Sequence, residues 1–97
     1  MALITPQELA DELHIDQSPE ELATLGTLLK DASAIIRGSI DSQLTEQAAF
    51  ELASEQFNRL VGSVATSLYY DRVLTNGFSH GQMIILQQLT GIVRGGA

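Results

Sequence analysis

The 97-residue sequence contains neither cysteine nor tryptophan. The absence of cysteine excludes a disulfide framework, a thiol nucleophile and a thiolate metal site, and it fits a reducing compartment. Basic residues are also scarce, with five Lys and Arg against twelve Asp and Glu. Tight binding to nucleic-acid phosphates needs clustered lysines and arginines, so this composition disfavours a DNA-binding surface.

Long apolar runs are missing as well. The longest, Met83 to Leu86, is far too short to span a bilayer, and the start of the chain lacks the basic residues and apolar stretch of a signal peptide. We therefore expect a protein that is made in the cytoplasm and has no membrane partner. A chain of this length should form a single helical domain, 1–97, whose modest core gains stability from burying apolar surface against a partner.

A stretch without proline, from Ala48 to Val73, organises the predicted fold. Its apolar residues recur every three or four positions, which predicts an amphipathic helix about 40 Å long, along which the other helices should pack. Thr45 is the expected N-cap and Asn76-Gly77 the expected stop. Gly62 interrupts this helix at its middle, where either a kink or the close approach of another helix would explain it.

Three further helices are predicted from their capping residues. Thr5-Pro6-Gln7-Glu8 and Ser18-Pro19-Glu20-Glu21 each combine an N-cap with a proline at the first helical position and an acid in the first turn. The first helix should end near His14 and the second near Ser39, and Ser79 can cap a last helix. The apolar stripe of that last helix should comprise Met83, Ile84, Leu86, Leu89, Ile92 and Val93, with Ile85 outside it. The expected fold is all-α, a small bundle of about four helices around one long central helix.

Few residues could carry chemistry. The two histidines, His14 and His80, lie near helix ends without a carboxylate or second histidine at metal-ligand spacing, so we expect caps or exposed side chains. The acids around the first linker could in principle hold a divalent cation, but they lack the ligand ladder of a calcium loop, and a solvated acidic surface is expected. There is no glycine-rich phosphate loop and no nucleophile beside a base. We therefore expect neither enzyme activity nor a cofactor.

Charge is divided unevenly between the two parts of the chain. Residues 1–58 contain eleven acids and two bases, giving −9, and residues 59–97 contain one acid and three bases, giving +2. One part could therefore attract the other part of a neighbouring copy. Acids also favour helix N-termini, which offers a second explanation, since two helices are predicted to begin in the first part.

The order of these elements resembles that of the head-tail connector proteins of long-tailed phages and prophages. The matching stretches are Leu3 to Asp16, where a short capped helix ends in a hydrophobic-Asp step; the second helix with Leu28-Leu29 and Ala32; Ala48 to Arg72, with tyrosines near its end; and Leu86 to Gly95. Members of the family often open the long helix with a proline after a longer irregular stretch. Here Asp41 to Thr45 is short and contains no proline, which leaves the link between the second and third helices open.

The resemblance implies a structural virion protein that forms a dodecameric ring beneath the portal protein after DNA packaging. The ring extends the DNA channel, presents a surface to the next neck or tail-completion protein, and remains in the virion neck. DNA passes through it without sequence-specific binding, as an acidic wall would allow.

Under this hypothesis the arginines of one copy meet the acids of the next. The predicted oligomer interface comprises Arg59, Arg72 and Arg94 against Asp11, Glu12, Glu20 and Glu21, with Ile84 and Ile85 as apolar contacts. A heterologous, head-to-tail interface of this kind closes into a ring when the rotation between copies allows. Reversing the charge at Arg72 should then impair assembly and leave the monomer folded.

Two other classes of protein remain open at this point. A small adaptor, similar to an antitoxin, could use the last helix to bind one partner and would form a stable dimer or heterodimer instead of a ring. A helix-turn-helix regulator could also be built from short helices, but it needs a basic recognition helix, and the last helix has a single arginine. Titration with duplex DNA at low salt separates the regulator from the other two classes.

Overall fold

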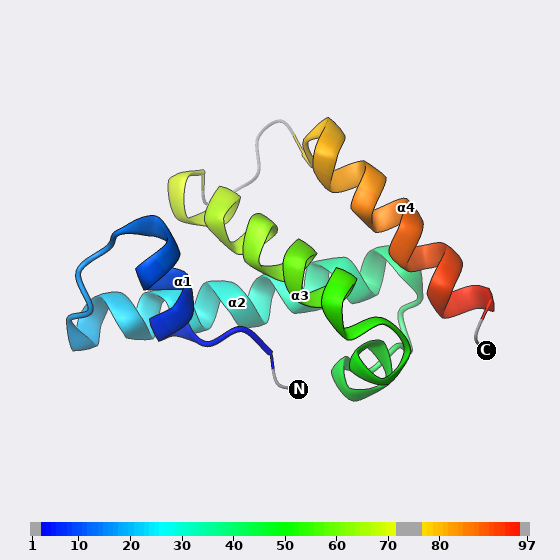
Figure 1. Ribbon diagram of the computed structural model, residues 1–97, viewed down its shortest axis with the longest axis horizontal. Helices are drawn as coiled ribbons and strands as arrows, with labels where there is room; N and C mark the ends of the chain where they lie inside the picture. The colour runs from blue at the N-terminus through cyan, green and yellow to red at the C-terminus, as the bar shows by residue number, and fades with distance from the viewer. Residues whose placement is uncertain (1–2, 72–76, 96–97) are drawn as a thin grey trace.

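The computed structural model describes residues 3–71 and 77–95, and all regular structure within these ranges is α-helical. Four helices follow one another, α1 (Pro6–Leu13), α2 (Pro19–Ile40), α3 (Glu46–Tyr70) and α4 (His80–Gly95). α2 and α3 lie against each other, while α1 packs on α2 at one end and α4 packs on α3 at the other (Figure 1). The predicted all-α fold is confirmed, although α2, with 22 residues, is nearly as long as α3, with 25.

Hydrogen bonds at the caps confirm the predicted helix starts. Thr5 Oγ1 accepts a bond from the backbone N–H of Glu8, and the Glu8 carboxylate accepts one from the N–H of Thr5, which closes the capping box of α1. Ser18 and Thr45 cap α2 and α3 through their hydroxyl oxygens. α1 ends before His14, which adopts the left-handed conformation with φ 56°. Local sequence therefore sets where these three helices begin.

A tight turn joins α2 to α3, which resolves the link that the sequence left open. The backbone N–H groups of Gln43 and Leu44 donate to the side chain and the backbone carbonyl of Asp41, each at 3.0 Å. Arg37 Nε donates to Ser33 Oγ at 3.1 Å, and its NH1 donates to the Leu44 carbonyl oxygen at 3.3 Å. The turn is thus held by its own aspartate and by α2, without a proline.

The predicted long helix is present as α3, but it bends sharply near its start, at Ala53, where the sequence predicted regular helix. Ala53 has φ −157° and ψ 60°, outside the helical region, and the two segments of α3 run in different directions (Figure 1). The rings of Phe50 and Phe57, one from each segment, make an edge-to-face contact with centroids 5.4 Å apart. The bend thereby lets both segments face the core, where Ala49 and Phe57 are fully buried.

The glycine predicted to mark a kink or a close helix contact does neither. The backbone at Gly62 is helical, and a Cβ placed there would lie 3.6 Å from Cδ1 of Ile4, an ordinary van der Waals distance. The neighbour is therefore the N-terminal segment, not another helix. At its far end α3 stops at Tyr70, with Asp71 as the C-cap. The predicted helical residues 72–73 and the stop residue Asn76 lie outside the described residues.

The core is mostly aliphatic and is formed by residues of all four helices. Its largest fully buried side chains include Phe57, Leu9, Leu25, Ile36, Leu60 and Leu89. Each such side chain contributes about 1.5–3 kcal/mol through its removal from water. Leu13 and Ile15 dock half-buried on this core. Ile35 on α2 and Leu52 on α3 are large hydrophobic side chains outside this core, each 37% exposed.

Candidate functional site

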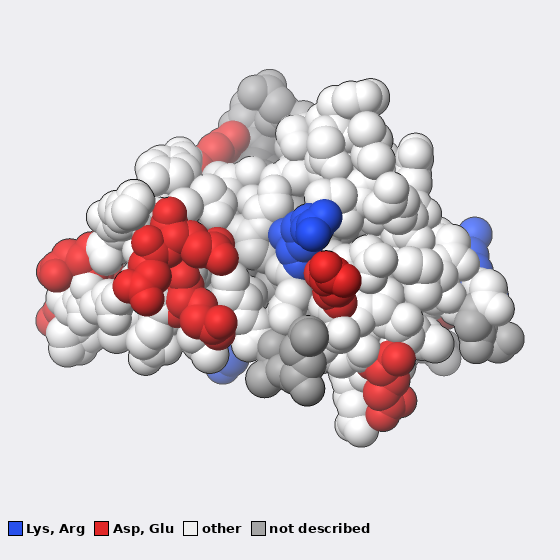
Figure 2. Space-filling model, viewed as in Figure 1, with Lys and Arg blue, Asp and Glu red and all other residues white. Residues whose placement is uncertain are grey.

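Acidic side chains gather over the end of the molecule formed by α1 and the start of α2 (Figure 2). Asp11, Glu12 and Glu20 are exposed there, and Glu21 is half-buried. Glu21 Oε2 accepts a 2.9 Å hydrogen bond from the Tyr69 hydroxyl, so this carboxylate also ties α2 to the end of α3. The fold thus brings the four predicted interface acids to one end.

Two of the predicted arginines, Arg59 and Arg94, lie within the described residues and away from the acidic end. Arg94 is exposed in the last turn of α4, at the end opposite α1 (Figure 1). Arg59 lies on α3, where its NH2 atom is 3.8 Å from Oε1 of Glu55, and the two side chains are 68% and 77% exposed. Exposed pairs of this kind contribute little to stability because water screens them. Arg72 lies outside the described residues.

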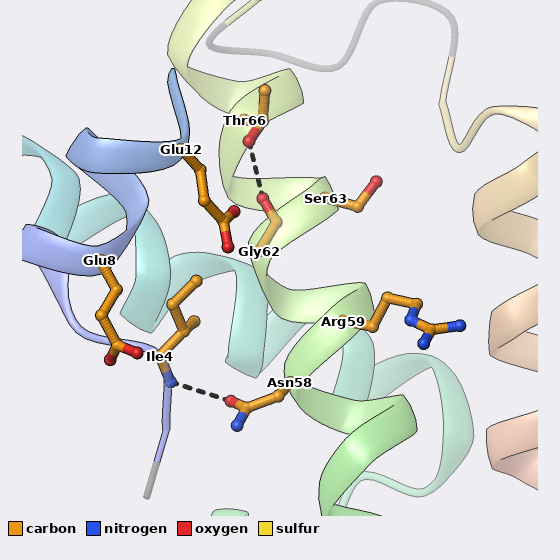
Figure 3. A pocket seen from close by; sticks show the side chains of 8 residues that line it. All are labelled: Ile4, Glu8, Glu12, Asn58, Arg59, Gly62, Ser63 and Thr66. Atoms are coloured by element: carbon orange, nitrogen blue, oxygen red, sulfur yellow. Dashed lines mark hydrogen bonds between the residues drawn. The ribbon is translucent and has the colours of Figure 1, made fainter. Parts of the chain in front are cut away.

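An open groove of about 810 Å³ separates α1 from the middle of α3 (Figure 3). It is lined by Ile4, Glu8, Glu12, Asn58, Arg59, Gly62, Ser63 and Thr66. The N–H of Ile4 donates to Asn58 Oδ1 at 2.9 Å and thereby fixes one edge of the groove. Glu12 and Arg59, which were predicted to meet across subunits, line this groove in one subunit, but Arg59 points away from the glutamate (Figure 3).

Two hydroxyl side chains that line the groove form hydrogen bonds within the subunit. Ser63 Oγ accepts a hydrogen bond from Gln82 Nε2 at 3.1 Å, and Thr66 Oγ1 donates to the Gly62 carbonyl oxygen at 2.8 Å, so both hydroxyls serve local structure. Within residues 3–71 and 77–95, no three histidine, aspartate or glutamate side chains are grouped so that they could hold a metal ion. The acidic end therefore presents charge without a built cation site.

The outward face of α4 carries no charge between His80 and Arg94. Ile84 and Met83 project from it and are 44% and 38% exposed. The surface over α4 correspondingly lacks acidic and basic side chains over most of its length (Figure 2). An uncharged surface with protruding apolar side chains is typical of the centre of a protein contact.

The core-facing side of α4 differs from the predicted stripe. Ile85, placed outside the stripe, packs half-buried against the core, while Met83 and Ile84, placed in it, project outward. Of the two isoleucines predicted at the interface, Ile84 is therefore available for contact and Ile85 is largely used within the subunit. The buried positions are Gln82, Leu86, Leu89 and Val93.

Gln82 is the residue that the sequence interpretation missed. It is 4% exposed, and its Nε2 donates to Ser63 Oγ at 3.1 Å and to Ser67 Oγ at 2.9 Å on α3. Its Oε1 accepts from the backbone N–H of Ser79 at 2.9 Å, and Ser79 Oγ accepts from the N–H of Gln82, which makes a capping box. The Ser-x-x-Gln spacing could have revealed the box, but the burial of the amide depends on two serines of another helix.

The described residues define an all-α domain of four helices packed in series. Comparison of the chain with models of protein families, with curated proteins and with solved structures finds no match. Within the described part of the chain, no helix has both the length and the hydropathy needed to cross a membrane. The candidate functional features of this domain are surfaces: the acidic end at α1, the uncharged outward face of α4 and Arg94 at the far end.

Proposed function

We propose that this protein is a head-tail connector of a long-tailed phage or prophage, a structural virion protein that forms a ring beneath the portal. The observation that carries the proposal is the separation of charge along the molecule. Acidic side chains gather at the α1 end, and Arg94 ends α4 on the opposite side. Such a molecule favours contacts in which the acidic end of one copy meets the α4 end of the next. Repeated head-to-tail contacts generate a ring when the rotation between copies closes.

Two further properties support this role. The apolar side chains exposed on α4 gain stability when a neighbour covers them, which favours assembly. A net charge of −7 keeps DNA from adhering to a channel wall, so packaged DNA can pass. The partners proposed are further copies of the chain, the portal protein and the next neck or tail-completion protein. The role is structural, without catalysis or a cofactor.

Mass in solution tests the proposal. Light scattering over a concentration series, with negative-stain images of any large species, is expected to reveal annular particles of about a dozen subunits, the ring size that the family resemblance implies. If the isolated protein stays monomeric, the same measurement is made with the portal protein of the same virus, on which the ring should form. A tight dimer would favour an adaptor, and failure to bind the portal in either state would overturn the proposal.

A second measurement separates the connector from a regulator. Duplex DNA titrated at low salt is expected to leave the anisotropy of a labelled fragment unchanged, because the protein is acidic and α4 carries a single arginine. Saturable binding of the fragment would contradict a connector and favour a helix-turn-helix protein.

A further inference from the structure

The outward face of α4 has the shape of a helix-packing surface that lacks its partner. We call Gly81, Ile84, Gln88 and Gly91 the α4 face; they recur at intervals of three, four and three residues, and all are exposed. A Cβ at Gly81 or Gly91 would meet nothing within 4 Å, so packing inside the subunit explains neither glycine. Glycine weakens a helix relative to alanine, and a helix of another chain that approaches closely would account for its presence here.

The outward face of α2 has matching properties. We call Thr27, Asp31, Ala34 and Gly38 the α2 face; they recur at intervals of four, three and four residues, and all are exposed. A Cβ at Gly38 would also meet open space. Ile35 beside this face is 37% exposed although it lies on a helix with a broad buried stripe. Because Ala34 and Gly38 are small and exposed, a large side chain from another helix can approach this part of α2 closely.

The two faces belong to helices that pack separately on α3. α2 and α4 each pack on α3 and make no extensive contact with each other (Figure 1). If the α4 face of one copy covers the α2 face of the next, each pair still has one free α4 face and one free α2 face. The contact therefore repeats from copy to copy until the chain of subunits closes.

Charge selects an antiparallel alignment of the two helices. With Ile84 of one copy set against Ala34 of the next, Arg94 lies ten residues further along α4, or about 15 Å. Glu20 lies fourteen residues back along the neighbouring α2, or about 21 Å in the same direction. An extended arginine side chain covers the difference, so Arg94 reaches the acidic end of the next copy.

The same register gives hydrogen-bond partners to two charged residues of α2, Asp31 on the α2 face and Lys30 beside it. Gln87 and Gln88, which are exposed on α4, come opposite Asp31 and Lys30. A carboxamide can both donate to a carboxylate and accept from an ammonium group, so neither charge is buried without a hydrogen bond. No charged residue of α4 opposes a like charge in this arrangement.

We therefore infer that a second copy of this chain covers the α4 face, and that it does so with its α2 face in antiparallel alignment. The inference rests on the proposed function, because a ring requires a head-to-tail contact. It assigns that contact to Ile84 set against Ala34 and Gly38, with Arg94 meeting Glu20 at one end.

Cysteine cross-linking tests the contact directly, since the chain contains no cysteine of its own. A chain with both Ile84→Cys and Ala34→Cys should form intermolecular disulfides under mild oxidation and give a ladder of multimers on a non-reducing gel. Gly91→Cys with Thr27→Cys tests the register and should give the same ladder. The control is Ile84→Cys with Glu51→Cys, whose second site is exposed on α3, away from the α2 face, and should give none. All sites are exposed, and circular dichroism checks that the variants are folded.

The outcomes distinguish this inference from the proposed function. Ladders from both test pairs support it, and a mixture of the Ile84→Cys and Ala34→Cys single variants should stop at a dimer. Strong dimer formation by Ile84→Cys alone would mean a twofold contact and would overturn the inference. Rings or portal binding without either ladder would also overturn it while leaving the connector proposal intact. If neither ladders nor rings nor portal binding were observed, the inference and the connector proposal would both be overturned.

Discussion

Ser33 Oγ donates a 2.7 Å hydrogen bond to Oε2 of Glu46, which joins the buried middle of α2 to the first residue of α3. The same hydroxyl oxygen accepts from Arg37 Nε at 3.1 Å. One buried hydroxyl therefore serves as donor and acceptor between two side chains that flank the tight turn. The arrangement ties the start of α3 to α2 across the turn.

Replacing Ser33 by alanine should destabilise the protein. The change leaves Glu46 and Arg37 each without one hydrogen bond next to the core, so the free energy of unfolding should fall by about 1–3 kcal/mol. Urea unfolding followed by circular dichroism measures it. Ser39→Ala is the matched control, because Ser39 is exposed and its hydroxyl donates only to the Ile35 carbonyl oxygen of its own helix. That variant should stay within about 0.5 kcal/mol of the parent, and equal losses would contradict the assignment.

Replacing Gln82 by leucine should loosen α4. Leucine has a similar volume but removes the donor to Ser63 and Ser67 and the acceptor for the N–H of Ser79. The free energy of unfolding should therefore fall by about 1–3 kcal/mol. Because these bonds anchor the start of α4, hydrogen exchange should accelerate at its backbone amides more than in α2. Gln87→Leu changes an exposed position of the same helix and should leave exchange in α4 unaltered. Uniform acceleration throughout the chain would contradict a local anchoring role.

Two glycines should respond to alanine in opposite directions. At Gly62 the added Cβ meets Ile4 Cδ1 at an ordinary 3.6 Å, so the helix-favouring effect should raise the free energy of unfolding by about 0.5–1 kcal/mol. At Gly77 the backbone has φ 68°, a left-handed conformation that is unfavourable for alanine. Gly77→Ala should therefore lower the free energy of unfolding by about 1–2 kcal/mol. Thermal unfolding measures both. A destabilising Gly62→Ala would contradict this expectation, because no neighbouring atom has to move to accept the added Cβ.

Charge reversal at Arg94 should impair assembly. Arg94→Glu places like charges at the proposed contact, so the ring fraction observed by light scattering should fall, while the monomer loses about 1 kcal/mol or less from the added charge at the end of α4. Combining Arg94→Glu with Glu20→Arg should restore assembly by exchanging the two signs. Wild-type assembly should also weaken in high salt, which screens exposed charges. A double variant no better than Arg94→Glu alone would show that these two residues do not meet.

Local patterns were sufficient for the helices but not for their bends or contacts. The N-caps Thr5, Ser18, Thr45 and Ser79 were readable because each acts on backbone groups within three residues. The bend at Ala53 was not, because alanine is the best helix former and no local breaker marks the position; the contact between the Phe50 and Phe57 rings across the bend appears only in the fold.

The surface was predictable in charge and less so in shape. The acidic end followed from the placement of acids near two helix starts. Periodicity could not decide between Ile84 and Ile85 because the run of apolar residues on α4 fits more than one stripe, and the buried amide of Gln82 settles the choice. The groove edge depends on Ile4 bonding to Asn58, which is 54 residues away in the chain. Such a pair leaves no periodic trace in the sequence.

The serial packing of the helices has a consequence for how the chain acquires its structure. α1 packs on α2, α2 on α3 and α3 on α4, so most contacts join helices that are neighbours in the sequence. Domains with such local topology fold on the order of microseconds to milliseconds, since few long loops have to close. During synthesis each helix can dock as soon as the next one emerges from the ribosome. The N-terminal segment is the exception, because Ile4 has to wait for Asn58, and we expect it to be among the last parts to settle.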